Sequence, residues 1–392
     1  MKDIVWVCHF YPFPSTGHGA LQRTHHLVKS VAQHHRVHVI AIGGDTARER
    51  DVLEMGVASV TKVALPSRLD KALAVARSLA SELTYWEALF VSSALREAVA
   101  RAVAREPSVL LLDTVFLAPL LDLVGKTPVV INHHNVESDV LVQRASRASR
   151  ATQRAFFGAQ ATKTFAREQE ASTRAHTNVL VSAEDGARFA VVAPDARIAV
   201  VANGVDVNFF VAPAGIARVP YSLVFAGGMD WFPNAHAVKW LCEEIWPAIA
   251  QAEPRRTLTI IGRNPPPEAA ALASRDPRVR VVGFVDDVRP HIAGAHAYLC
   301  PITVGGGTRL KVLDALAMRC PLVATGLSVE GLDLRDRQHY LKAESISQMA
   351  AALATLDENP ELVFELQQNG RRHVEDRFAW SVVAESLLRV LN

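Results

Sequence analysis

The sequence is poor in cysteine, and this shortage excludes two classes of protein. Its 392 residues include four cysteines, Cys8, Cys242, Cys300 and Cys320, and no two of them form a C-x-x-C pair. Such wide spacing argues against a disulfide framework and against a zinc site. We therefore expect reduced, structural thiols in a cytoplasmic protein.

An excess of charge and long apolar runs are also missing. Lys and Arg total 42 against 40 Asp and Glu, a net charge of +2, which argues against general nucleic-acid binding. The N-terminal stretch MKDIVWVCHFYPFP lacks the cleavage site of a signal peptide and is typical of a first β-strand. The apolar stretch 108–125 is interrupted by Asp113 and Asp122, so it is a poor membrane span. We expect no integral membrane segment.

Short apolar runs alternate with helical patterns along the whole chain. In the first half, the predicted strands are residues 3–8, 36–42, 108–113, 128–132, 178–182 and 198–202. In the second half, they are residues 222–228, 257–262, 279–285, 297–302 and 321–326. Runs of this length between helices predict parallel strands that are buried on both faces.

The predicted fold is α/β, with two Rossmann-like, doubly wound domains in tandem. One hydrophobic core rarely exceeds about 250–300 residues, so two domains are expected. The segment VNFFVAPAGIARVP, with two prolines and a glycine, breaks the alternation. We place an N-terminal domain at residues 1–208, a linker at 209–220 and a C-terminal domain at 221–376. Ligands bind outside the carboxyl ends of strands in such sheets, so we expect the domains to face a central cleft that holds the site.

Three glycines, Gly305–Gly307, separate a predicted strand from a helical stretch. Glycine allows unusual backbone angles and a close approach of the backbone to a ligand, and the start of a helix can receive a phosphate. Arg309 and Lys311 can neutralise its charge, and Asp314 can accept hydrogen bonds from sugar hydroxyls. The alternative is a glycine-rich turn with a solvated Arg and Lys.

A glycine pair, Gly17 and Gly19, stands where the chain enters the first predicted helix. It is either an anion-binding loop or only a tight turn. Gln22 replaces the third glycine of the dinucleotide fingerprint, and no ribose-binding acid closes strand 36–42. A nicotinamide-dependent oxidoreductase is therefore the less favoured reading.

Several segments, taken together, resemble the family 4, GT-B-fold glycosyltransferases (glycosyl transferases group 1). They are PSTGHGALQRTHHL, NHHNVES, VANGVDVNFF, FAGGMDWFPNAHAVKWLCEEIWPAI, VVGFVDDVRPHIAGAHAYLCPI, GGGTRLKVLDALAMRCP and RFAWSVVAESLLRVL. Their order is that of the family, and they cover nearly the whole chain. The resemblance implies that a terminal helix, residues 377–392, crosses back to the N-terminal domain.

The resemblance implies a retaining, hexosyltransferase-type enzyme that uses a nucleotide diphosphate sugar, UDP- or GDP-linked. The N-terminal domain would face a glycan, lipid-linked or other hydroxyl acceptor, and the second domain would hold the nucleotide. Members of this type need neither metal nor cofactor, so protein cations must stabilise the departing diphosphate. The implied role is surface polysaccharide or glycoconjugate synthesis, with a natural-product acceptor as the alternative.

The resemblance also assigns roles to individual residues. It implies that His134 lies near the donor sugar and that Arg309 and Lys311 lie beside the donor phosphates, as the catalytic residues. The implied donor-binding residues are Gly17, Gly19, Asn234, Phe284, Val285, Gly305, Gly306, Gly307, Thr308 and Asp314. Within this set, Asp314 would hold the ribose hydroxyls, and Phe284 and Val285 would contact the base.

Two departures from the family pattern leave an alternative open. Gly306 occupies the place of the family's first acid, so no carboxylate can touch the donor sugar from there. The usual Arg and Lys are absent from GGMDWFPN, where Asn234 is a weak substitute. A catalytically degenerate subunit that binds a nucleotide, a glycan or a partner is the alternative.

A pair of histidines and a set of four arginines each allow a purely structural interpretation beside a functional one. His133 and His134 could form only a capped turn at a strand end. Four arginines recur at spacings of three and four, so one helix would gather them near one side. Their side is either solvated or in contact with anionic headgroups at the inner membrane surface. These arginines are Arg144, Arg147, Arg150 and Arg154.

Overall fold

The computed structural model describes residues 1–13, 19–43 and 46–392 of the chain. The chain forms two compact units: unit 1 is Met1–Ala202 with Val383–Asn392, and unit 2 is Asn203–Val382. Residues 209–220, predicted as a linker, belong to unit 2 in this division. The last helix, α16 (Trp380–Leu391), starts in unit 2 and ends in unit 1.

Unit 1 is built on a parallel sheet. Among its described residues, seven strands have the order β3-β2-β1-β4-β5-β6-β7. They are β1 (Asp3–Cys8), β2 (Arg36–Ile42), β3 (Ser59–Val63), β4 (Val109–Leu112), β5 (Val129–Asn132), β6 (Thr177–Leu180) and β7 (Ile198–Val200). All pairings are parallel. The sequence did not predict β3, because this edge strand is only partly buried and carries no continuous apolar run.

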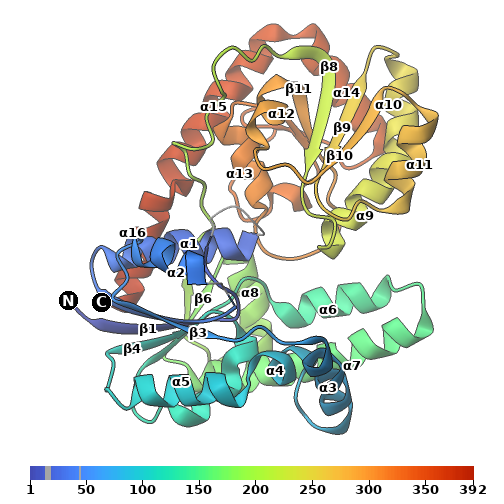
Figure 1. Cartoon of the computed structure of the whole chain (residues 1–392). Coiled ribbons are helices and arrows are strands. Elements are labelled where there is room, and N and C mark those ends of the chain that lie inside the picture. The colour runs from blue at the N-terminus through green and yellow to red at the C-terminus, as the bar shows by residue number, and fades with distance from the viewer. Residues whose placement is uncertain (14–18, 44–45) are drawn as a thin grey trace. The chain divides into compact units, whose positions relative to one another are not determined.

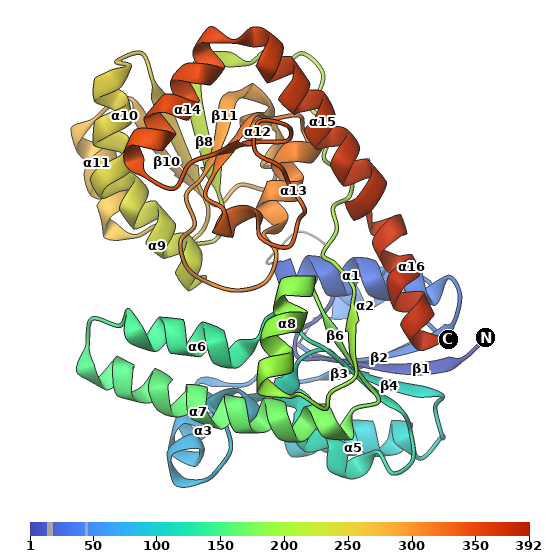
Figure 2. The same cartoon turned by 180° about the vertical axis from the view of Figure 1, so that it is seen from behind.

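Helices pack around this sheet (Figures 1 and 2). They are α1 (Gly19–Ala32), α2 (Thr46–Leu53), α3 (Arg68–Ala80), α4 (Tyr85–Phe90), α5 (Ser93–Val103), the 3-10 helix η1 (Val115–Leu123), α6 (Glu137–Ser146), α7 (Ala151–Arg174) and α8 (Ala183–Val192). The core gathers Leu95 and Val99 of α5, Leu110 and Leu112 of β4, and Phe116 of η1. Burial of these apolar side chains stabilises the unit.

Unit 2 holds a second parallel sheet, of six strands among its residues, with the order β10-β9-β8-β11-β12-β13. The strands are β8 (Val219–Ala226), β9 (Thr257–Ile261), β10 (Val279–Gly283), β11 (Ala295–Cys300), β12 (Leu322–Ala324) and β13 (Leu341–Lys342). All pairings are parallel. The short edge strand β13 was not predicted, because two residues give no periodic signal.

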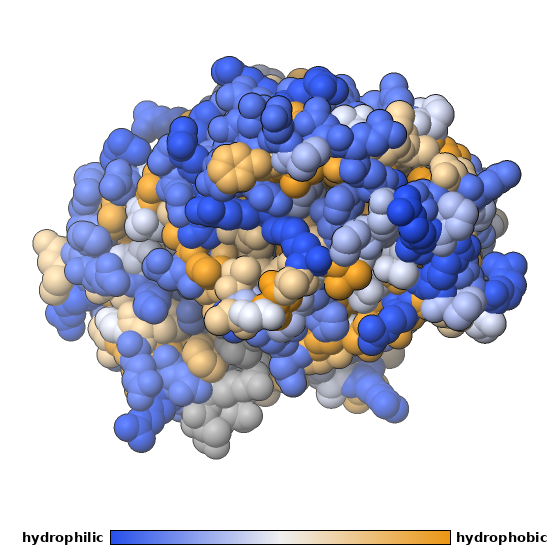
Figure 3. Space-filling model, turned by 90° about the horizontal axis from the view of Figure 1, so that it is seen from above, coloured by the Kyte–Doolittle hydropathy of each residue, from blue (hydrophilic) through white to orange (hydrophobic). Residues whose placement is uncertain are grey.

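The helices of unit 2 complete a second doubly wound unit. They are α9 (Phe232–Trp240), the π-helix η2 (Leu241–Ile245), α10 (Trp246–Ala252), α11 (Pro267–Arg275), α12 (Arg289–Gly294), α13 (Leu310–Ala317), the 3-10 helix η3 (Leu327–Val329), α14 (Ile346–Glu358) and α15 (Pro360–Phe378). Figure 3 shows a face where hydrophilic side chains predominate and hydrophobic ones lie in short groups between them.

The two parallel sheets with their surrounding helices confirm the prediction of two Rossmann-like, doubly wound α/β domains.

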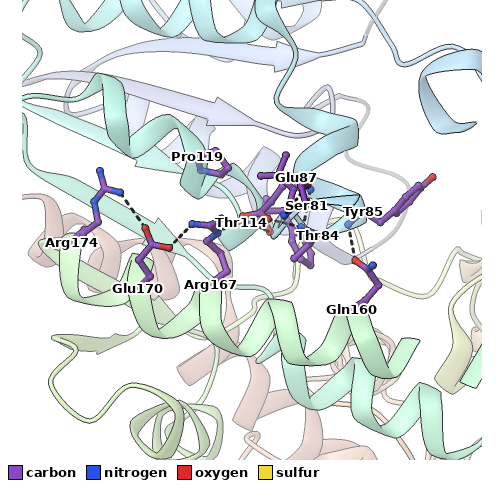
Figure 4. A network of polar contacts seen from close by, with 12 residues as sticks. Ser81, Thr84, Tyr85, Glu87, Thr114, Pro119, Gln160, Arg167, Glu170 and Arg174 are labelled. Carbon is purple, nitrogen blue, oxygen red and sulfur yellow. Dashed lines mark hydrogen bonds and ion pairs between the residues drawn. The ribbon is translucent and has the colours of Figure 1, made fainter. Parts of the chain in front are cut away.

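A polar network joins α4 to α7 within unit 1 (Figure 4). Glu87 is 1% exposed, and its Oε2 accepts a hydrogen bond from the backbone N–H of Thr84 at 2.7 Å. Its Oε1 lies 2.5 Å from Nε of Arg167, and Tyr85 N donates to Oε1 of Gln160 at 2.6 Å. Burial raises the pKa of Glu87, against the effect of Thr84 and Arg167. These contacts bring together segments that are about eighty residues apart.

Over residues 1–13, 19–43 and 46–392, no helix has both the length and the apolar character needed to cross a bilayer.

Candidate active site

Each sheet has one point where the strand order reverses, between β1 and β4 in unit 1 and between β8 and β11 in unit 2. Ligands of open α/β sheets bind outside the carboxyl ends of the strands at this point, because the flanking loops leave toward opposite faces. Polar side chains gather at both points.

Lys311 is the central cation at the unit 2 point. It lies in the first turn of α13, after β11, and its Nζ donates a hydrogen bond to Oδ1 of Asn234 at 2.5 Å. The same nitrogen lies 4.5 Å from the ring centroid of Phe225, on β8. Asn234 is buried, and its Nδ2 donates to the carbonyl of Gly228 at 2.7 Å. The Asn234 amide therefore has both ends occupied and holds the lysine in place.

The environment lowers the pKa of Lys311 to about 8, first through burial and then through the nearby Arg309 charge. A half-buried ammonium held by one amide oxygen and one aromatic face is only partly compensated. Such a group gains by pairing with an anion.

Two glycines are needed here for different reasons. Gly305 has φ +106°, and a Cβ at this position would lie 2.7 Å from Cγ of Pro233. A Cβ at Gly227 would lie 2.4 Å from Nζ of Lys311 and 2.9 Å from Nδ2 of Asn234. Side chains at either position would displace the groups that make the site.

The rest of the predicted triple-glycine turn supports the start of α13. Gly307 has φ +70°, and the carbonyl of Gly306 accepts a hydrogen bond from Nη1 of Arg309 at 2.9 Å. Thr308 is buried, and its Oγ1 accepts a hydrogen bond from Nδ2 of Asn203 at 2.7 Å. Arg309, itself buried, is the N-cap residue, and no side chain of the described residues caps the helix. The helix N-terminus, Arg309 and Lys311 therefore concentrate positive charge after β11.

Asp314 lies one turn beyond Lys311 on α13. Its Oδ1 is buried and has no hydrogen-bond partner among the described residues. Burial raises the pKa of Asp314 to about 8, against the effect of the Lys311 charge. Below that pH the carboxyl is mainly neutral, so it can both donate and accept a hydrogen bond, which suits a hydroxyl-bearing ligand.

Phe284 and Val285 directly follow β10, so they lie at the carboxyl end of this strand. In the sheet, β10 neighbours β9, which in turn neighbours β8. Phe284 is 63% exposed, and the guanidinium carbon of Arg263 lies 5.7 Å from its ring centroid. Val285 is half-buried. An exposed ring of this kind can stack on a planar group.

At the unit 1 point, a buried aspartate organises the polar groups. Oδ2 of Asp113 accepts a hydrogen bond from Oγ1 of Thr24 at 2.5 Å, and its Oδ1 accepts one from Nδ2 of Asn132 at 2.6 Å. Nε2 of His134 lies 3.5 Å from Oδ1 of Asp113 and 3.2 Å from its carbonyl oxygen. Burial alone would raise the pKa of Asp113, but the charge and hydrogen bond of His134 and the bond from Thr24 lower it overall. Asp113 therefore orients the His134 ring.

Sequence reasoning named His134 but missed its partner Asp113 and the polar side chains around that carboxylate. It treated Asp113 only as an interruption of an apolar run, although an acid that ends a buried strand beside the first strand was an available signal. Arg23 was also missed: its Nη2 donates to Oδ1 of Asn132 at 3.0 Å and its Nη1 donates to the carbonyl of Ala202 at 2.7 Å. Burial lowers the pKa of Arg23 to about 10.

Of the predicted glycine pair, Gly19 is the first residue of α1, and Gly17 lies outside the described residues.

The two adjacent histidines differ in environment. His133 is buried, its Nε2 lies 3.1 Å from Oδ1 of Asn178, and its ring packs 4.5 Å from that of Phe189. Burial lowers the pKa of His133 to about 4, so it is neutral and structural. His134 is the one beside Asp113.

The four arginines that were expected on one side of a single helix do not lie on one helix, because that helix is broken. α6 ends at Ser146 and α7 begins at Ala151, so the four arginines fall on two helices and the turn between them. The guanidinium carbon of Arg144 lies 4.1 Å from the ring centroid of Phe157, which makes it a packing residue. A similar break separates α4 from α5, where Ser92 caps the start of α5.

Residues 1–13, 19–43 and 46–392 contain no group of three or more His, Cys, Asp or Glu side chains arranged to hold a metal ion.

Comparisons with known proteins add a family match and a fold match. Residues 220–359 match the family model described as Glycosyl transferases group 1. Anabaena HepE, solved with UDP and glucose, is 15% identical with a TM-score of 0.71, covering 100% of this chain and 99% of its own. Sucrose-phosphate synthase from Thermosynechococcus elongatus is 15% identical with a TM-score of 0.73, covering 100% and 98%. S. aureus TarM is 9% identical with a TM-score of 0.71, covering 100% and 99%. No curated protein matches the chain in sequence.

These findings confirm the resemblance to glycosyl transferases group 1, with the family match over residues 220–359 and the GT-B fold over the chain. The matched segment contains Asn234, Phe284, Val285 and the whole turn from Gly305 to Asp314. The cationic site described above therefore lies inside the family match.

Proposed function

We propose that this chain is a retaining glycosyltransferase that moves a hexose from a UDP- or GDP-linked donor to a hydroxyl group of its acceptor. The observation that carries the proposal is the partly compensated Lys311 ammonium, beside Arg309 and bare glycine backbone, at the strand-order reversal of unit 2. A family match over the same residues supports it. The HepE structure named above and a structure of a TarM mutant contain UDP, which supports a uridine nucleotide.

In this proposal the diphosphate is the anion that pairs with the cations of unit 2. Lys311 and Arg309 pair with its oxygens, and backbone N–H groups at the start of α13 donate to them. Asp314, neutral below a pKa of about 8, does not repel the diphosphate and is free to bind a ribose hydroxyl. Phe284 stacks on the base.

The same groups serve the chemical step. Negative charge grows on the departing diphosphate in the transition state, so cations fixed before the reaction lower the barrier. We propose that Lys311 and Arg309 do this without a metal or cofactor. His134, oriented by Asp113, is proposed to meet the reacting sugar, because Gly306 offers no carboxylate for that purpose.

The acceptor is proposed to be a glycan or a lipid-linked saccharide in surface polysaccharide or glycoconjugate synthesis, with a natural-product hydroxyl as the alternative. A lipid-linked acceptor would bring the chain to the inner membrane surface. The four buried, free cysteines favour a reducing compartment, so we place the activity in the cytoplasm.

A thermal-shift screen with UDP, GDP, ADP and dTDP, followed by transfer assays with their sugars, tests the proposal. We expect one diphosphate to raise the unfolding temperature and its sugar to be consumed with an acceptor. No shift with any nucleotide would reject the proposal. Tight binding without consumption of any donor would instead support the degenerate binding subunit suggested by Gly306.

A further inference from the structure

Helix α3 places its apolar side outward. Leu65, just before the helix, is 70% exposed, and Leu69 and Leu79 are each 68% exposed. Leu73 and Val75 are exposed as well. Among the described residues, Leu53 is the one exposed leucine outside this segment. We name Leu65, Leu69, Leu73, Val75 and Leu79 the α3 leucine surface.

The helical period explains how this surface arises. Ala74 and Ser78 are the buried residues of α3. At about 100° per residue, they fall on one side of the helix, while Leu69, Leu73 and Leu79 fall on the opposite side. An ordinary surface helix buries its apolar stripe and exposes its charges. This helix does the reverse, so the stripe does not serve the core of unit 1.

The helix is firmly built in this orientation. Ser67 and Asp70 form a capping box, with Ser67 N donating to Oδ2 of Asp70 at 2.8 Å. At the other end, Nζ of Lys163 donates to the carbonyls of Ser78 and Ser81, each at 2.5 Å. Both ends are therefore held while the apolar side remains in solvent.

Cations flank the α3 leucine surface. Arg68, Lys71 and Arg77 are exposed, and among the described residues no carboxylate lies within ion-pair distance of them. The one acid of the helix, Asp70, is engaged by Ser67, whose hydrogen bonds lower its pKa. A second copy of the chain fits poorly here, because a two-fold contact would bring these cations against their own copies. Apolar side chains bordered by unpaired cations match an anionic bilayer surface.

We propose that the α3 leucine surface binds the surface of an anionic lipid bilayer, with the leucines among the acyl chains and Arg68, Lys71 and Arg77 at the headgroups. The inference goes beyond transferase activity and does not depend on it. Binding is measured without any nucleotide, so its failure and the failure of the proposed function are separate results.

Cosedimentation of the full chain tests the proposal, with vesicles of phosphatidylcholine alone and with phosphatidylglycerol in equal parts. We expect binding to the anionic vesicles that weakens with salt. The double variant Leu69→Ser/Leu73→Ser should lose at least about tenfold in affinity. Arg68→Gln/Arg77→Gln should lose about fivefold per cation. Val191→Ser and Arg105→Gln, exposed positions elsewhere in unit 1, serve as matched controls and should bind normally.

Three results would overturn the proposal. The first is no binding of the unaltered chain to anionic vesicles. The second is unchanged binding by Leu69→Ser/Leu73→Ser, whose unaltered melting temperature would show that it folds. The third is a dimer in light scattering that this variant converts to a monomer, without vesicle binding, which would assign the surface to self-association.

Discussion

Lys311 Nζ and Asn234 Oδ1 lie 2.5 Å apart although the residues are 77 positions apart in the chain. The bond joins the segment after β8 to the helix after β11, the two strands between which the sheet order reverses. Because Asn234 is itself anchored on the carbonyl of Gly228, the ammonium has little freedom. Its position is set before any ligand arrives, which lowers the reorganisation that binding requires.

Replacing Lys311 with Ala should weaken UDP binding by about 10–150-fold, the effect of about 1.5–3 kcal/mol from one charge-assisted hydrogen bond. Isothermal titration measures this affinity. The melting temperature should not fall, because the variant removes a desolvated charge. Lys239→Ala, which removes an exposed lysine of α9, is the control. Equal UDP affinity in both variants would contradict the assignment.

UDP affinity should also depend on pH. The pKa of Lys311 is about 8 in the free protein, and a bound diphosphate favours the charged form. Affinity should therefore be full below about pH 8 and fall as the pH rises above it. A binding curve that is flat through this range would show that the ammonium does not meet the diphosphate.

Gly227→Ala should disrupt the same site by geometry alone. The added methyl would lie 2.4 Å from Nζ of Lys311, so the lysine must move and UDP affinity should drop by roughly tenfold or more. Gly158→Ala is the matched control: its Cβ meets nothing within 4 Å, and it lies inside α7. That change should stabilise the fold by about 0.5–1 kcal/mol and leave UDP binding intact. Normal UDP affinity in Gly227→Ala would argue against the geometry.

Asp113→Asn should reduce both stability and sugar transfer. An amide N–H would face the Thr24 hydroxyl or the Asn132 amide, at a cost of about 1–3 kcal/mol in unfolding free energy. His134 would lose the charge that orients it, so turnover should fall more than UDP affinity. Asp122→Asn, at an exposed site, is the control. Unchanged turnover would leave Asp113 with a structural role only.

Arg167→Met should destabilise unit 1, because it leaves Glu87 buried without its ion pair. The loss should fall below the about 3–5 kcal/mol typical of a fully buried pair, since Arg167 keeps some exposure. Adding Glu87→Gln should recover part of it. Arg174→Ala, which breaks two exposed pairs, with Asp122 and Glu170, should cost less than about 1 kcal/mol per pair. Urea denaturation measures all four proteins, and equal losses for the two arginine variants would refute the expectation.

Acid should destabilise unit 2 through His339. Burial, with the His373 charge, lowers the pKa of His339 from 6.5 to about 4, and its Nδ1 accepts a hydrogen bond from Arg335 N at 3.0 Å. Between about pH 6.5 and 4 the unfolded chain binds a proton that the folded chain does not, so stability falls as the pH falls through this window. His339→Gln should remove about one proton from the slope of unfolding free energy against pH. A slope that is the same in His339→Gln and in the unaltered chain would contradict this expectation.

Local patterns in the sequence were enough to predict the alternation of strands and helices, the two doubly wound units and the glycine turn with its two cations. Each depends on residues close together in the chain: a run of β-branched residues, a glycine where the backbone takes φ +106°, or a cation in the first turn of a helix. Where the pattern was weak, as at β3 and β13, or continued across a short break, as at residues 147–150, the prediction failed.

Only the tertiary structure decided which side chains meet. The bond from Asn234 to Lys311, the cluster of Asp113 with Thr24, Asn132 and His134, and the outward leucines of α3 each depend on how strands are ordered and helices packed. The hydrophobic periodicity of a sequence indicates that a helix has an apolar side, but packing decides whether that side is buried. The sequence by itself therefore determined the elements and the chemistry available to this protein, and the three-dimensional fold determined which groups share a site.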